Sequence, residues 1–194
     1  MLRKRLAAMV IPISIIVTGG AFASGPPSGS GRSDTSDKAA KSSAMYSVLH
    51  AVGQWSISLS EMADKKAKSE LVKGYAREVT TNNANSDAKL LGIAKKEGVN
   101  VGPLDPQTED GKSLLDRIKA ETQLLSSLKG DAFDKEYMTL VTNTQQSVSH
   151  FLEAHKAAAK DPAAKKLMGD MHSTIQQRLK TAQDILAKVY GNSI

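Results

Sequence analysis

Four polar side chains interrupt the apolar stripes of four predicted long helices, and their types limit the chemistry available there. They are Ser56, Asn83, Gln145 and Arg178. A hydroxyl, two amides and a guanidinium form hydrogen bonds readily, but none is a carboxylate or imidazole of the kind that divalent metals prefer. The set predicts a hydrogen-bonded polar layer in the core. A small pocket for an anionic or neutral ligand around Arg178, and a one-residue error in helix phase, are the two alternatives.

The spacing of these positions predicts that they lie at matching heights. The first two lie 13 residues before and 14 residues after a predicted turn at Ser69, and the last two lie 16 before and 17 after Asp161. With a rise of roughly 1.5 Å per residue, each antiparallel helix pair is level to within about one residue. Helical bundles commonly place ligand sites among such facing side chains.

A buried guanidinium needs a compensating partner. Asp87 lies one helical turn after Asn83 on the same predicted helix. We therefore predict that either Asp87 or hydrogen bonds from Ser56, Asn83 and Gln145 compensate Arg178.

Two histidines give a weaker alternative metal site. His150 and His172 each lie 11 residues from Asp161, so they are level on neighbouring helices, but Glu153 is the only obvious carboxylate near them. A surface or boundary role is expected for both. No nucleophile elbow, HExxH, P-loop or dinucleotide motif occurs, so the sequence predicts neither an enzyme nor a cofactor.

The N-terminus has the parts of a secretory signal peptide. Arg3 to Arg5 are basic, residues 6–17 are apolar, and Ala21-Phe22-Ala23 offers a cleavage site. The apolar run is shorter than the roughly 20 residues that span a bilayer, so cleavage after Ala23 is predicted, with an uncleaved anchor as the alternative. Cleavage would leave no transmembrane segment.

Charge and cysteine content exclude several classes of protein. Loss of three basic residues with the signal peptide lowers the formal charge from +6 to +3, and no run of five or more basic residues occurs. Binding to nucleic acid is therefore not expected. The absence of cysteine excludes disulfides and thiolate metal sites.

The remaining chain predicts one all-α domain behind a short linker. Residues 24–37 are rich in Gly, Pro and Ser, and residues 38–191 carry helical periodicity with no strand pattern. Gly98 and Gly130 are predicted helix stops, and Asp131 and Asp161 are predicted N-caps. The expected helices are approximately 38–68, 69–98, 107–129, 131–160 and 162–190.

Several segments identify a family. They are YAREV (75–79), AKKEGV (94–99), GDAFDKEYM (130–138) and AHKAAAKDPAAKKL (154–167). In these segments, and over about residues 45–186, the chain resembles domain-of-unknown-function family 4142, exported helical proteins related to ferritin-like bundles. The resemblance implies a ferritin-like antiparallel four-helix bundle with one extra short crossing helix.

The resemblance also implies a metal site inside the bundle, built from acidic residues and histidines. The corresponding positions in this chain are Ser56, Ser58, Asn82-Asn83, Gln145 and Arg178. All have lost metal-ligand chemistry, so a degenerate, metal-free site is predicted.

The expected protein is therefore exported, located in the periplasm or at the outer membrane, and non-enzymatic, with an interaction or stress-related role. A metal-binding or metal-oxidising ferritin-like protein is the alternative. A third hypothesis is binding of anionic cell-envelope components through basic helix faces.

Overall fold

The computed structural model describes residues 33–159 and 161–191, which form five α-helices and no strands. The predicted signal peptide (1–23) and residues 24–32 of the predicted linker lie outside the described residues. Residues 33–37, predicted as linker, are helical. The helices are α1 (Ser33–Lys66), α2 (Glu70–Lys96), α3 (Glu109–Ser127), α4 (Gly130–Ala158) and α5 (Pro162–Tyr190).

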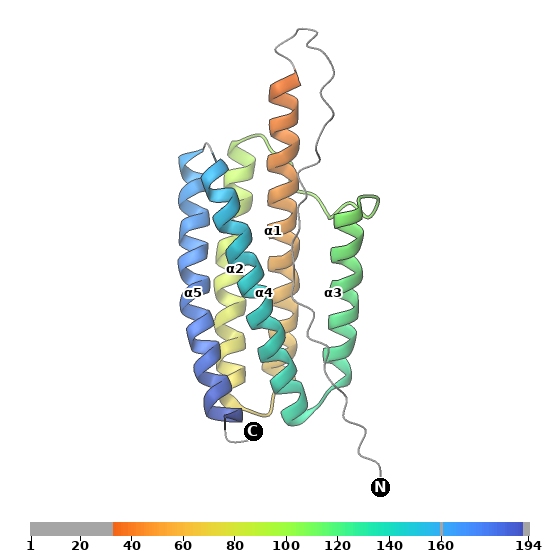
Figure 1. Ribbon diagram of the computed structural model, residues 1–194, viewed down its shortest axis with the longest axis vertical. Helices are drawn as coiled ribbons and strands as arrows, with labels where there is room; N and C mark the ends of the chain where they lie inside the picture. The colour runs from red at the N-terminus through yellow and green to blue at the C-terminus, as the bar shows by residue number, and fades with distance from the viewer. Residues whose placement is uncertain (1–32, 160, 192–194) are drawn as a thin grey trace.

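The four long helices form an antiparallel bundle (Figure 1). Short turns join α1 to α2 and α4 to α5, while α1 also packs against α4 and α2 against α5. The shorter α3 runs beside the bundle and contacts α1 and α4, carrying the chain back from the end of α2 to the start of α4 (Figure 1). The Trp55 indole on α1 holds it by donating to the Thr122 hydroxyl over 3.0 Å. The predicted all-α bundle with one additional helix is confirmed.

Local signals correctly predicted two helix ends. After α2, Gly98 has a φ of 67°, and the Gly98 and Val99 amides donate to the carbonyls of Lys95 and Ala94. This is the Schellman arrangement that favours glycine. Before α5, the Asp161 carboxylate accepts from the amides of Ala163 and Ala164, as expected for an N-cap followed by proline.

The predicted cap of α4 is wrong. Lys129, not Asp131, is the N-cap residue, and no side chain caps this helix end. The chain turns through Gly130, whose φ is 57°. The Asp131 carboxylate instead accepts from the exposed ammonium of Lys68 over 3.1 Å.

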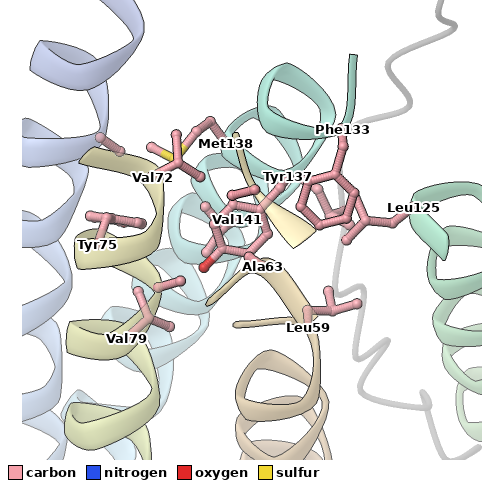
Figure 2. Packing of buried hydrophobic residues seen from close by; sticks show 14 of the residues in the cluster. Leu59, Ala63, Val72, Tyr75, Val79, Leu125, Phe133, Tyr137, Met138 and Val141 are labelled. Atoms are coloured by element: carbon pink, nitrogen blue, oxygen red, sulfur yellow. The ribbon is translucent and has the colours of Figure 1, made fainter. Parts of the chain in front are cut away.

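The core consists of two apolar clusters, one toward each end of the bundle. One surrounds the α1–α2 turn and includes Phe133, Tyr137 and Met138, all fully buried (Figure 2). The other lies toward the opposite end, around Leu90 and Leu152. Burying each such large side chain stabilises the fold by roughly 1.5–3 kcal/mol.

The Phe-Asp-x-x-Tyr segment at the start of α4 supports the α1–α2 turn. Asp134 is 1% exposed, and its carboxylate accepts from the backbone amides of Lys68 (3.0 Å) and Ser69 (2.7 Å). The Tyr137 hydroxyl lies 2.9 Å from that of Ser60 on α1. This segment is therefore structural: it satisfies backbone donors that the turn leaves without helical partners.

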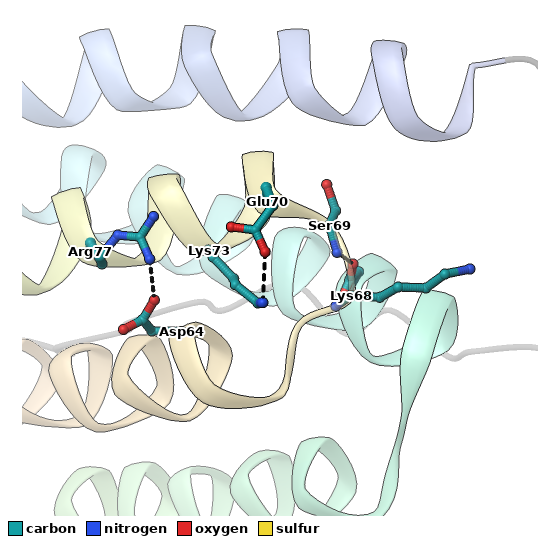
Figure 3. Close-up of polar contacts among 7 residues, drawn as sticks. Asp64, Lys68, Ser69, Glu70, Lys73 and Arg77 are labelled. Atoms are coloured by element: carbon teal, nitrogen blue, oxygen red, sulfur yellow. Dashed lines mark hydrogen bonds and ion pairs between the residues drawn. The ribbon is translucent and has the colours of Figure 1, made fainter.

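Exposed ion pairs surround the same turn. Arg77 contacts Asp64 and Lys73 contacts Glu70, each over 2.7 Å (Figure 3). Surface pairs of this kind contribute little, so the buried Asp134 carries most of the polar stabilisation at this end.

Candidate polar site in the bundle core

The four polar positions lie between the two apolar clusters. On each long helix, residues of one cluster precede the polar residue and residues of the other follow it, as Val52 and Leu59 do on α1. The structure places all four side chains around one cavity of about 50 Å³. Its walls comprise Leu49, Val52, Gly53, Ser56, Asn83, Ser86, Thr144, Gln145, Val148, Met171, Thr174, Ile175 and Arg178.

Burial differs among the four. Gln145 (4% exposed), Arg178 (5%) and Ser56 (9%) are buried, whereas Asn83 is half-buried. The side chains predicted to interrupt the helix stripes therefore face a common interior space, and Asn83 lies nearest to solvent.

Arg178 is the only charged side chain among the described residues lining the cavity. Its Nη1 donates to Asn83 Oδ1 over 2.9 Å. Its Nε is buried without a hydrogen-bond partner among the described residues. Burial lowers the pKa of Arg178, and Tyr75 and Glu78 act in the opposite direction, but a guanidinium remains charged in proteins.

Gln145 has a partner that the sequence did not indicate. Its amide nitrogen donates to the Tyr75 hydroxyl over 2.8 Å, and that hydroxyl also lies 3.3 Å from the Arg178 carbonyl oxygen. Burial raises the pKa of Tyr75 to about 12, with the Gln145 hydrogen bond acting in the opposite direction. Tyr75 is a core residue of α2 that is 3% exposed, and only the need of a buried phenol for a hydrogen-bond partner could have singled it out in the sequence.

Asp87 does not compensate Arg178. Its carboxylate lies 2.7 Å from His50 Nδ1 and accepts from the Gln54 amide over 2.8 Å. Asp87 therefore links α2 to α1 outside the cavity. Asn83 provides the predicted hydrogen bond to the guanidinium, and Gln145 and Ser56 do not.

The two histidines of the alternative site approach one carboxylate. Glu153 lies 3.2 Å from His172 Nε2 and 3.9 Å from His150 Nδ1, whose ring is 83% exposed. Within the described part of the chain, no cluster of three or more His, Asp or Glu side chains could hold a metal ion.

The residues at the positions where the resemblance implies a metal site do not fit a metal. Ser58 is exposed and Asn82 is half-buried, and neither lines the cavity. A fixed guanidinium would repel a divalent cation, and hydroxyl and amide groups are weak ligands for it. The donor set is therefore unsuited to metal chemistry.

The chain matches the profile of a known protein family. The profile of the family "Domain of unknown function (DUF4142)" matches residues 28–185. The chain belongs to this family. No functionally curated protein matches it.

A solved structure supports the fold of this DUF4142 protein. A predicted secreted protein of family DUF305 from Streptomyces coelicolor superimposes with a TM-score of 0.64 at 16% identity, covering 76% of this chain and 92% of the other. At that identity the likeness concerns the fold alone. Within residues 33–159 and 161–191, no helix has the length and apolarity that a membrane span requires.

Proposed function

We propose that this DUF4142 protein is an exported, non-enzymatic helical-bundle protein of the periplasm or outer membrane, with a degenerate ferritin-like site. Its role is an interaction or stress-related one rather than metal chemistry. The observation that carries the proposal is Arg178, a buried cation that donates a hydrogen bond to the Asn83 amide, at a position where the resemblance implies a metal-binding histidine.

Export is supported independently. The basic, apolar and small-residue segments of residues 1–23 have the order of a signal peptide, and the structural neighbour is itself described as a predicted secreted protein. The absence of cysteine is compatible with an oxidising compartment, where free thiols would be at risk.

The test is the metal content of the protein purified from its native compartment without chelators. We expect iron, zinc and manganese well below one equivalent per chain. One equivalent of a metal, retained through dialysis, would contradict the proposal and favour the metal-binding alternative.

A further inference from the structure

The central cavity combines a positive charge with available hydrogen-bond donors. Arg178 is 5% exposed and, among the described residues, its side chain makes one hydrogen bond, to the neutral amide of Asn83. Its buried Nε–H has no partner among the described residues. A buried cation that lacks a counter-charge is costly, as is a buried donor that lacks an acceptor.

No described residue lining the cavity supplies the missing negative charge. The lining contains hydroxyls, amides and apolar groups but no carboxylate. Asp87, the carboxylate that the sequence predicted as a partner of Arg178, is engaged by His50 and Gln54. Glu78, whose charge acts on Arg178, is exposed and forms no ion pair with it in the described structure. The charge of the site is therefore positive and locally uncompensated.

We propose that this cavity binds a small monovalent anion of the nitrate or halide class beside Arg178. The proposal rests on the metal-free core proposed above and names the ligand of that core. Arg178 supplies the charge, and Ser56 and Ser86 line the same space with hydroxyls that can rotate to donate to an anion.

The size of the cavity limits the ligand. A single water needs at least about 10–15 Å³ of such space, so a cavity of about 50 Å³ has room for one ion of a few atoms. Ser86 and Thr174 in its wall are half-buried, which places part of the lining near the surface. A bulky organic anion such as gluconate is too large to enter.

The test compares sodium nitrate with sodium gluconate at equal ionic strength, by calorimetric titration and by thermal unfolding of the purified protein. We expect saturable binding of nitrate at one site and a rise in Tm that saturates with it, because a ligand that binds only the folded state stabilises it. Gluconate should give neither. Equal responses to both anions would overturn the proposal and leave water as the occupant.

Two variants locate the site. Asn83 Oδ1 lies 2.9 Å from Arg178 Nη1, so Asn83→Asp places a carboxylate oxygen beside the guanidinium. This internal counter-ion should weaken nitrate binding at least tenfold while keeping the fold. Arg178→Met, which removes the charge at similar volume, should do the same. Lys180→Met removes an exposed cation two residues away and should bind nitrate as the wild type does.

The outcomes separate the two proposals. Nitrate binding that is unchanged in both Asn83→Asp and Arg178→Met would place the anion elsewhere and overturn the inference. Lack of nitrate binding in a metal-free wild type would overturn the anion site alone. Stoichiometric metal in the native protein would overturn the proposed function.

Discussion

At the scale of single residues, Arg178 is the side chain whose removal is most informative. Arg178→Ala deletes a buried group and leaves the Asn83 amide oxygen without its donor, so we expect a loss of about 2–4 kcal/mol in the free energy of unfolding. Lys180→Ala, on the exposed face of the same helix, should change it by less than about 1 kcal/mol. Equal, small losses in urea unfolding would mean that Arg178 is solvated.

Arg178→Met separates charge from volume. Replacing a buried charge with an apolar side chain of similar size is commonly neutral or stabilising. The Met variant should therefore unfold far closer to the wild type than the Ala variant does.

Tyr75 predicts a dependence of stability on alkaline pH. Burial raises its pKa from 10.0 to about 12, so the folded state keeps the phenol neutral where the unfolded chain ionises. This stabilisation is complete below pH 10 and is lost between pH 10 and 12, at roughly 1 kcal/mol per pH unit.

The variant Tyr75→Phe tests this dependence. At pH 8 it should be less stable than the wild type, because Gln145 loses its hydrogen-bond partner. Above pH 10 the gap should narrow, since the variant has one ionising phenol fewer. Parallel stability curves in urea from pH 8 to 11.5 would contradict the role assigned to Tyr75.

For these core residues, the sequence predicts position along the bundle but not hydrogen-bond partners. The common height of Ser56, Asn83, Gln145 and Arg178 could be predicted from their spacing alone, because the rise of a helix and the geometry of a short antiparallel turn are regular. Spacing could not assign partners. Asp87 was a candidate for Arg178 from its place along α2, but the rotation of α2 against α1 brings it to His50 instead.

At the scale of elements, the α1–α2 turn depends on a carboxylate from α4. Asp134→Ala leaves two backbone amides without their charged acceptor, so we expect a loss of about 1.5–3 kcal/mol. Asp131→Ala, three residues earlier and in an exposed pair with Lys68, should cost less than about 1 kcal/mol. Similar losses for the two variants in urea unfolding would show that the Asp134 contacts add nothing beyond a surface charge.

The ends of the elements show which signals are local. Asp161 before Pro162 and Gly98 after two lysines act through neighbouring backbone atoms, so their roles can be predicted from sequence. Asp131 had the residue type of a cap, yet Lys129 takes that position because the backbone turns at Gly130. Asp134 looked like an ordinary helix residue, since its two partners lie 65 and 66 residues away.

At the scale of the whole molecule, export is directly testable. We predict that the mature protein begins at Ser24, because Ala21 and Ala23 provide the small side chains of a cleavage site. N-terminal sequencing of the protein from fractionated cells measures this. A native protein that begins at Met1 would contradict cleavage and favour the retained anchor.

The bundle itself follows from the sequence because four long apolar stripes can be buried together in few ways. The position of α3 is less determined. Its apolar face is only partly covered, with Leu125 buried but Leu124 48% exposed. The position of α3 is therefore set by tertiary contacts, such as that of Trp55 with Thr122, and not by the apolar pattern of α3 itself. The anion that we propose for the cavity could not be predicted from the apolar stripes or from the position of α3. It depends on which charged groups lie near Arg178 in the folded protein.

The most direct test of the account is a calorimetric titration of Zn²⁺ into the wild type and into a variant that combines Ser56→Glu, Asn83→His, Gln145→His and Arg178→His. All four positions line one cavity, so the changes place one carboxylate and three imidazoles around a common centre. We expect no specific binding by the wild type and one zinc per chain in the variant, which should also gain stability with zinc concentration. Stoichiometric binding by the wild type, or a folded variant that binds no zinc, would contradict the account.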